Sequence, residues 1–508
     1  MTDQAITSPL AIWPEPLSER SIATRLPALL ATALPAYLVE QRWYGEKSRP
    51  LRHATIQHVY AESRGHLWIA LSFAVLSYDD GNEDATYFIP VVIDSSVEKD
   101  SSTIARIIDH ADQTWTVVDA SSNQGFQRWI IESAGNQSVQ VISSDVFCSW
   151  QAPHPESISR STAAASKLLG GEQSNSNIAF GNESIVKVFR RVQPGLNPDI
   201  EIGRYLTEEA RNQHVAPLLA DWTLVSGPGA SSSIGLAQRH VANVGDGWKW
   251  LLDRMRAAHG DPNIIEEIAS SINLLGQRTA DVHCALARGT TSDLVPHTIS
   301  VEQAQGWHKN ADNQFVETRE RLSGIDQLHI DASTQELIQR FAREADSIRS
   351  ELAEFKHLVG FAAIRVHGDY HLGQTLHTPE GDWVLIDFEG EPARSLDERR
   401  SRSSPLKDVA GMLRSLAYAR AFARASDSPC WIDESRRLDQ AFIDGYLSTV
   451  AGVDQAPALI PVDVDQFTHA LRPWVIEKAI YEIDYELDNR PDWLWAPLRA
   501  LFAEPTSN

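Results

Sequence analysis

The sequence predicts an α+β fold with two lobes, in which a β-rich part precedes a mainly helical part. Strand-like apolar segments dominate the first 240 residues, and long amphipathic segments of helical period follow Gly247. The composition is that of an ordinary globular chain, with 43% hydrophobic and 22% charged residues among 508. Because this length exceeds one compact core, we predict an N-terminal cap over 1–103, a β-rich lobe over 104–240 and a helical lobe over 241–508.

The elements follow from hydrophobic periodicity. In the cap, one helix is predicted over 22–39 and strands over 54–60, 66–76 and 86–93, and a polar interval over 94–103 marks its end. In the second part, strands are predicted over 115–118, 138–142, 184–189 and 234–241, with a helix over 199–207. In the third part, helices are predicted over 248–259, 264–287, 301–322, 334–358, 410–425 and 464–487.

Charge and cysteine content exclude several classes of protein. A net charge of −23 is against binding to nucleic acid or to an anionic membrane surface, since both require a basic footprint. The three cysteines are far apart and form no C-x-x-C pair, which indicates a reducing compartment and no zinc site. The chain shows no signal-peptide pattern, and its longest mainly apolar run, 67–76, is too short to cross a bilayer. We therefore expect a cytoplasmic protein.

The segment 366–374, Val-His-Gly-Asp-Tyr-His-Leu-Gly-Gln, carries the strongest functional signal. Asp369 and Gln374 stand five positions apart, the D-x-x-x-x-N spacing of a protein-kinase catalytic loop with Gln in place of Asn. Asp387 follows an apolar run, as the metal-binding Asp of D-F-G does. We predict that Asp369 is the catalytic base and that Gln374 and Asp387 bind Mg²⁺ through oxygen atoms. The two motifs together predict an ATP-dependent phosphotransferase with a bilobal, protein-kinase-like fold.

Residues upstream of this segment supply a candidate nucleotide site. Lys187 stands in an apolar strand, where a kinase places the lysine that pairs with the phosphates. Glu201, in the helix that follows, is its predicted partner, and Glu208 is the alternative. Small polar residues in 171–177 could hold phosphates through backbone N–H and hydroxyl groups, and the segment 238–241 could receive the adenine. The nucleotide-contacting candidates in these two segments are Ser174, Asn175, Ser176, Gln238 and Val241.

Each of these signals has a simpler interpretation. Taken alone, Lys187 would be a surface lysine on an edge strand, and the loop 171–177 a solvent loop. His367 and His371 have the i,i+4 spacing of a zinc pair, although no third ligand is near. Asp408 is a helix N-cap in the simpler interpretation and an anchor for the catalytic loop in the functional one, and the two are compatible. The arginines after Asp387 form either a salt-bridged loop or a phosphate clamp; they are Arg394, Arg399, Arg400 and Arg402.

Several segments resemble the bacterial maltokinases, kinase-like proteins related to the aminoglycoside phosphotransferases. The segment 41–47, Gln-Arg-Trp-Tyr-Gly-Glu-Lys, is similar to the signature of the family's N-terminal cap. The other segments that carry the resemblance are 189–201, 275–283, 367–374, 386–394, 404–414 and 477–494. The resemblance implies transfer of phosphate from ATP to maltose, giving maltose 1-phosphate for glycogen synthesis from trehalose. It also implies the roles given above to Lys187, Glu201, Asp369, Gln374 and Asp387.

The acceptor is where alternatives remain open. Tyr370 stands where the family usually has an aliphatic residue, and we expect it to border the acceptor site. In the last long helix, tyrosines and glutamates at i,i+4 spacing, with Trp474 and Trp493, could form a sugar-binding wall or serve in packing. The acceptor-contacting candidates are His367, Tyr370, His371, Glu389, Tyr481, Glu482 and Tyr485. Glucosamine, another aminosugar or an aminoglycoside is the alternative acceptor. A third hypothesis is a catalytically minor partner of trehalose synthase, and a complex with that enzyme is compatible with activity as well.

Overall fold

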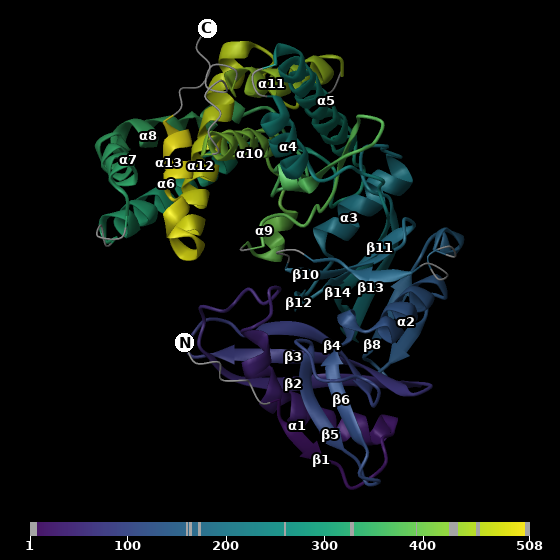
Figure 1. Cartoon of the computed structure of the whole chain (residues 1–508). Helices are drawn as coiled ribbons and strands as arrows, with labels where there is room; N and C mark the ends of the chain where they lie inside the picture. Colours follow the sequence, from purple (N-terminus) through teal and green to yellow (C-terminus); the bar gives the residue numbers. More distant parts are fainter. Residues whose placement is uncertain are drawn as a thin grey trace. The chain divides into compact units, whose positions relative to one another are not determined.

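The computed structural model describes residues 8–158, 161, 165–170, 174–258, 261–325, 330–392, 394–425, 435–453 and 458–502. The predicted phosphate-loop residues 171–173, and Cys430, lie outside these ranges. The chain divides into two compact units, which are described one at a time. The first comprises residues 1–201 and 217–240, and the second comprises 202–216 and 241–508. Figure 1 labels the elements of both units.

The first unit contains two seven-stranded sheets. The first sheet has the order β1-β5-β6-β4-β3-β2, and β12 pairs with β4. Its strands are β1 (Leu10–Ile12), β2 (Leu51–Arg64), β3 (Leu67–Tyr78), β4 (Ala85–Asp94), β5 (Thr103–Ile108), β6 (Thr114–Asp119) and β12 (Arg191–Val192). The first sheet crosses the boundary predicted at 103/104, because β5 begins at Thr103. That boundary was wrong: the polar interval is a connection between paired strands.

The second sheet has the order β7-β8-β13-β14-β11-β10-β9. Its strands are β7 (Val139–Val141), β8 (Phe147–Gln151), β9 (Ser166–Leu168), β10 (Asn175–Phe180), β11 (Ser184–Phe189), β13 (Leu218–Gly227) and β14 (Ala230–Arg239). The unit also contains α1 (Glu19–Leu38) and α2 (Gln124–Gly135), and it ends within α3 (Pro198–Arg204). Strand β14 ends just before one of the points where the chain passes into the second unit, at Val241.

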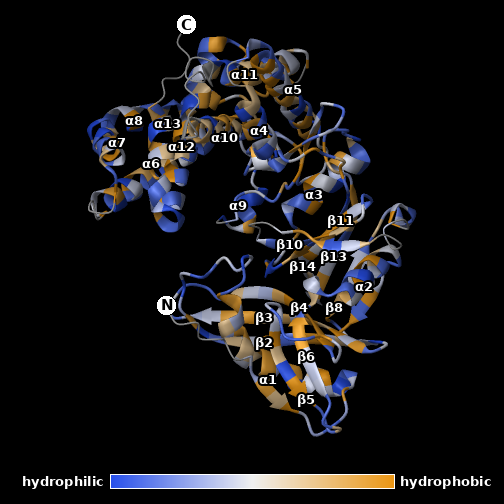
Figure 2. Cartoon of the chain, viewed as in Figure 1, coloured by the Kyte–Doolittle hydropathy of each residue, from blue (hydrophilic) through white to orange (hydrophobic). Residues whose placement is uncertain are grey.

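Both faces of the first sheet are buried, and this explains the continuous apolar run of β3. Alternate residues of β3 point to opposite faces. Ala70 and Ala74 join a core with α1, whereas Leu71 and Phe73 join a core with α2 and the second sheet. In that second core, Phe73 stacks on Phe88 at 4.9 Å between ring centroids, and Phe88 meets Trp222 of β13 at 5.3 Å. The two sheets therefore share one core, and Figure 2 shows how dense hydrophobic residues are in the strands of the first sheet.

The second unit is mainly helical. Its helices are α4 (Gly247–Ala258), α5 (Pro262–Leu286), α6 (Val301–Ser323), α7 (Ala332–Arg343), α8 (Ala345–Leu352), α9 (Leu396–Arg400), α10 (Leu406–Ala425), α11 (Ser435–Ala451), α12 (Val464–Asn489) and α13 (Trp495–Leu501). Two short antiparallel strand pairs interrupt them, β15 (His297–Thr298) with β16 (Ala362–Ala363), and β17 (Thr375–His377) with β18 (Trp383–Leu385). The helix predicted over 334–358 is two helices and a 3-10 turn, η6 (Ala353–Leu358). Among the described residues, no helix combines the length and apolar character that a membrane crossing needs.

Candidate active site

In the first unit, Lys187 lies on β11, which pairs with β10 on one side and β14 on the other. Its Cα is opposite that of Asn177, and its side chain is only 7% exposed. The ammonium donates to the carboxylate of Asp199 at 2.9 Å. Asp199 is in the first turn of α3, where its backbone N–H is capped by the side chain of Asn197. Lys187 and Asp199 therefore form a buried ion pair in the sheet where we predict the nucleotide site.

Sequence reasoning missed Asp199 and chose Glu201, two residues further along the same helix. Glu201 is also buried, and a role for it beside Lys187 stays a prediction. Asp199 was overlooked because it reads as an ordinary helix-start residue after Asn197-Pro198. The alternative partner Glu208 is an exposed residue of the π-helical segment after α3.

The predicted phosphate-loop residues differ in exposure. Ser174 is exposed and Asn175 is half-buried at the start of β10, whereas Ser176 is buried. The hydroxyl of Ser176 accepts a hydrogen bond from Arg190 Nε at 2.8 Å. Ser176 therefore anchors β10 through its side chain, and its contact with phosphate stays a prediction. Contacts of Ser174, Asn175, Gln238 and Val241 with the nucleotide stay predictions.

In the second unit, Asp408 holds the catalytic loop, which confirms the anchor interpretation of this residue. Its carboxylate accepts the backbone N–H groups of His367 at 2.7 Å and Gly368 at 2.9 Å. It also accepts from Nε2 of His283 on α5 at 3.0 Å, and Nδ1 of His283 lies 2.8 Å from the hydroxyl of Tyr446 on α11. Burial acts to raise the pKa of Asp408, but these hydrogen bonds outweigh it and lower the pKa below its usual value.

His367 serves the architecture of the loop. Its side chain is 2% exposed, and Nε2 donates to the backbone carbonyl of Ile386 at 2.9 Å. This bond ties the catalytic loop to the residue before Asp387. Among the described residues, the group that could hold a metal ion includes neither His367 nor His371, so the zinc pair gains no support. The predicted contact of His367 with the acceptor stays a prediction.

The two predicted metal ligands lie together. Gln374, which ends the 3-10 turn η7 (Leu372–Gln374), donates from its amide nitrogen to a carboxylate oxygen of Asp387 at 2.9 Å. Asp387 has φ +70°, an uncommon conformation for a residue other than glycine that is often found at functional sites. A carboxylate and an amide oxygen are ligands that suit Mg²⁺. The residues present therefore fit the predicted cation.

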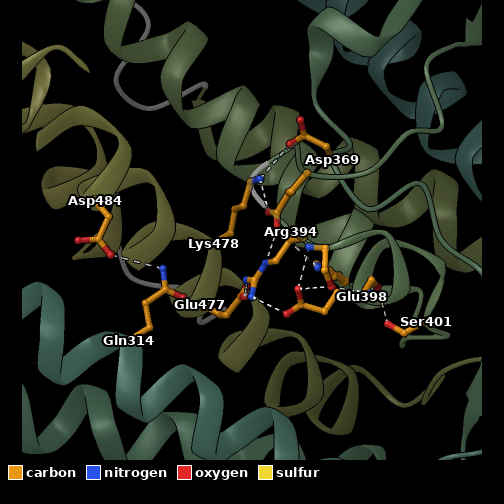
Figure 3. A network of polar contacts seen from close by, with 11 residues as sticks. Gln314, Asp369, Arg394, Glu398, Ser401, Glu477, Lys478 and Asp484 are labelled. Carbon is orange, nitrogen blue, oxygen red and sulfur yellow. Dashed lines mark hydrogen bonds and ion pairs between the residues drawn. The ribbon is translucent and has the colours of Figure 1, made fainter. Parts of the chain in front are cut away.

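Lys478 of α12 lies beside the predicted catalytic base, and this contact was not predicted. Its ammonium donates to Asp369 at 3.1 Å and to Glu391 at 2.8 Å (Figure 3). Burial acts to lower the pKa of Lys478, but the carboxylates of Glu391 and Asp369 outweigh it and raise the pKa well above its usual value. Lys478 is thus a cation at neutral pH. The sequence signal that could have identified Lys478 is a lysine next to the buried residues Ala479 and Ile480 of a helix.

Several acceptor candidates have other partners. Tyr370 is 2% exposed, and its hydroxyl lies 2.7 Å from that of Thr279 on α5, so its predicted place at the acceptor was wrong. Close packing explains this, because a Cβ on Gly411 of α10 would lie 2.5 Å from the carbonyl oxygen of Tyr370. Trp474 is a core residue whose ring packs against Trp307 at a tilt and against Phe355 edge to face.

Of the candidates on α12, Tyr481 is the one beside the predicted base. The ammonium of Lys478 lies 4.6 Å from the centre of its ring, and burial raises the pKa of Tyr481 to about 12. Glu482 accepts from Nε of the buried Arg414 at 2.8 Å, and Tyr485 is 43% exposed. His371 caps η7 through Nδ1, and burial lowers its pKa, so its ring is neutral at pH 7. Acceptor contacts of His371, Glu389, Tyr481, Glu482 and Tyr485 stay predictions.

Comparison with known proteins decides the identity of the first sheet. Residues 37–122 match the family model of the maltokinase N-terminal cap domain. The chain carries a maltokinase N-terminal cap. This confirms the resemblance inferred from residues 41–47. The matched segment ends with η1 (Ala120–Ser122), and Ser121 accepts a hydrogen bond from Arg190, the residue after β11.

Curated relatives and solved structures extend the likeness beyond the cap. A glucosamine kinase of Streptacidiphilus jiangxiensis is 27% identical over 338 residues, which are 64% of this chain and 70% of the relative. A glucosamine kinase of Mycolicibacterium smegmatis (strain ATCC 700084 / mc(2)155) is 23% identical over 353 residues, covering 68% of this chain and 82% of the relative.

The solved structures show the fold. A glucosamine kinase in crystal form B has a TM-score of 0.62 and 19% identity, over 94% of this chain and 98% of that one. A glucosamine kinase in complex with glucosamine, ADP and inorganic phosphate has a TM-score of 0.58 at the same identity and coverage. The predicted kinase-like fold with an N-terminal cap is therefore confirmed.

Proposed function

We propose that this chain is an ATP- and Mg²⁺-dependent sugar kinase whose acceptor is maltose. The maltokinase cap and the glucosamine kinase relatives both support a sugar kinase. The observation that carries the proposal is the triad of Asp369, Lys478 and Glu391, in which a carboxylate at the kinase base position is paired with a buried cation. The solved relative with bound ADP supports the use of a nucleotide.

In this proposal, Asp369 orients the acceptor hydroxyl and accepts its proton as the oxygen bonds to the γ-phosphorus. The bond from that phosphorus to the bridging oxygen breaks at the same time, and ADP leaves. Asp408 and His367 hold the loop so that Asp369 keeps one position. Lys187, neutralised by Asp199, would place its ammonium on the phosphates. Gln374 and Asp387 would hold Mg²⁺, which neutralises phosphate charge when bound.

The charges on α12 favour a neutral acceptor over an aminosugar. A protonated amine bound near Asp369 would meet the ammonium of Lys478, and like charges repel. The carboxylates of Glu482 and Glu486, which could hold an amine, are already paired with Arg414 and Arg490. These pairs support maltose. The names of the relatives support the alternative, glucosamine, and this keeps both acceptors in the test.

The test is sugar-dependent ADP release, measured with Mg-ATP and with maltose, glucose or glucosamine. We expect maltose to give the highest kcat/KM and Asp369→Asn to lower kcat by about 10²- to 10⁴-fold, because general-base catalysis is lost. EDTA should abolish turnover, and Mg²⁺ should restore it. A higher kcat/KM with glucosamine would favour the alternative acceptor, whereas full activity of Asp369→Asn would refute the mechanism.

The predicted complex with trehalose synthase is a separate question. Co-elution of the two proteins in size-exclusion chromatography would support it. A catalytically minor role is disfavoured, because the paired side chains of Lys187, Asp369, Gln374 and Asp387 are all present.

A further inference from the structure

Glu391 is the buried carboxylate of the triad, and the reaction steps proposed above give it no part of their own. It follows Asp387 by four residues, and its side chain is 1% exposed. Three cations surround it: Lys478 Nζ at 2.8 Å, Arg394 Nε at 3.1 Å and Lys407 Nζ at 3.9 Å. Burial acts to raise the pKa of Glu391, but these cations outweigh it and lower the pKa, so the group is ionised at neutral pH. An ionised carboxylate this deeply buried needs such partners to persist.

Ion pairs join the loop after Asp387 to helix α12 at two adjacent helix residues, Glu477 and Lys478 (Figure 3). One oxygen of Glu391 accepts from Lys478, and the other accepts from Arg394. Arg394 in turn donates to Glu477 at 3.0 Å, and Glu477 precedes Lys478 on α12. The loop after Asp387 therefore supplies one anion and one cation, and α12 supplies the opposite pair. This crossed arrangement fixes the position of Lys478 along the helix.

A fixed position matters for a lysine beside a catalytic base. A lysine side chain has a flexible four-carbon stem, and fixing it in one rotamer costs about 2 kcal/mol of conformational entropy. Contacts with other residues must therefore hold the ammonium in place. Without Glu391, the ammonium would have Asp369 as its nearest anion and would compete with the acceptor hydroxyl for it. With Glu391 in place, the charge is shared, and one N–H of Lys478 remains directed at Asp369.

We propose that Glu391 is a positioning residue of phosphoryl transfer, which holds Lys478 where its ammonium faces Asp369 and the acceptor hydroxyl. This inference rests on the proposed function. Arg394 in turn holds Glu391, and Glu477 holds Arg394. The basic cluster after Asp387 thus serves a salt-bridged loop, the simpler of its two interpretations. Arg399 and Arg402 bind backbone carbonyls, and Arg400 pairs with Asp293.

The test compares Glu391→Gln with Glu398→Gln in the full-length chain. Glu398 approaches Arg394 from the solvent side at 3.9 Å, and Gln can keep its capping contact with Ser395. We expect Glu391→Gln to lower kcat by about 10²-fold, comparable with the loss of one oriented donor, and to change KM for ATP little. Glu398→Gln should keep nearly full activity, and Glu391→Asp should recover part of the lost kcat.

The pH profile separates positioning from simple stability. Lys478 faces Glu391, Asp369 and Tyr481 directly, His371 lies near it, and Lys407 and Arg394 face Glu391. Loss of the Glu391 charge lowers the pKa of Lys478, so the alkaline limb of the kcat profile should move to lower pH. A uniform loss at every pH, matched by a fall in Tm, would overturn the proposal.

A double variant keeps the test sharp if Glu391→Gln is unstable. Lys478→Met with Glu391→Gln removes one charge of each sign, so no buried charge is left unpaired by the pair itself. If Glu391 acts through Lys478, its substitution should not lower kcat further in the Lys478→Met background. Independent, multiplicative losses would refute the inference. If the unsubstituted chain phosphorylates a sugar and Glu391→Gln has the same kcat, this inference alone is overturned. If the unsubstituted chain phosphorylates no sugar, the proposed function is overturned as well.

Discussion

At the scale of single residues, Asp408 has the most connections around the candidate active site. Its two oxygens accept three hydrogen bonds, two from the backbone of the catalytic loop and one from His283. An asparagine offers one acceptor oxygen, and its amide nitrogen would face an N–H group. We therefore expect Asp408→Asn to lower the free energy of unfolding by about 3–5 kcal/mol, the usual effect of breaking a buried charged network. It should lower kcat as well, because Asp369 follows Gly368 directly.

The same substitution should change how stability depends on pH. The folded-state pKa of Asp408 is depressed, so its contribution is fully present above the unfolded pKa of about 3.9. It is lost as the pH falls through the folded pKa. Denaturant titrations between pH 7 and pH 3 should therefore show a shallower acid loss for Asp408→Asn. Asp465→Asn, at an exposed first-turn position of α12, is the control and should leave the slope unchanged.

At the scale of elements, Arg190 joins the cap to strands β10 and β11 within the first unit. It directly follows β11, and its guanidinium donates to Ser176 of β10 and to Asp119 and Ser121 at the end of the cap, each at 2.8 Å. The same group lies 4.5 Å from the ring centre of Trp43, in the cap signature. This contact gives the signature a structural reason, which its sequence did not reveal.

We expect Arg190→Ala to lower the free energy of unfolding by about 3–5 kcal/mol, because it leaves the buried Asp119 without its cation. Arg190→Lys should recover little, since an ammonium cannot reproduce the planar set of donors. Arg52→Ala is the matched control. Arg52 pairs with Asp79 with both side chains 58% exposed, so its loss should cost about 0–1 kcal/mol by denaturant titration.

The sequence predicts most elements because their periodicity is strong. The strand predicted over 184–189 has those bounds in the structure, and the helix predicted over 22–39 is α1. The break between α7 and α8 escaped prediction, because it falls at Glu344, where neither Gly nor Pro marks it. Tyr370 was misplaced for a related reason. Burial in a helical core depends on contacts with Thr279 and Gly411, which are distant in sequence.

The candidate site was predictable where residues are close together in the chain. The spacing of Asp369, Gln374 and Asp387 was sufficient to propose the reaction. Lys478 and Glu391 were not identified, since their meeting depends on how α12 packs against the loop 388–394. Motif spacing carries no information on such long-range pairs.

At the scale of the whole molecule, the cap shares its core with the second sheet of the first unit. We predict that a chain lacking residues 1–122 exposes the aromatic face around Phe180 and Trp222 and is insoluble or binds the dye ANS. Soluble yield, ANS fluorescence and thermal melting would measure this. A soluble, cooperatively melting fragment would show that the second sheet is stable without the cap.

The contacts of Arg190 show that the domain recognised by homology and the compact structural unit have different boundaries. The unit recognised by homology ends at residue 122, whereas the packed unit continues to residue 240 and includes the strand of Lys187. In a chimaera that exchanged only the homologous segment, Asp119 would come from one parent protein and its partner Arg190 from the other. Exchange of residues 1–240 keeps that pair within one parent, so the larger segment is the unit to transplant.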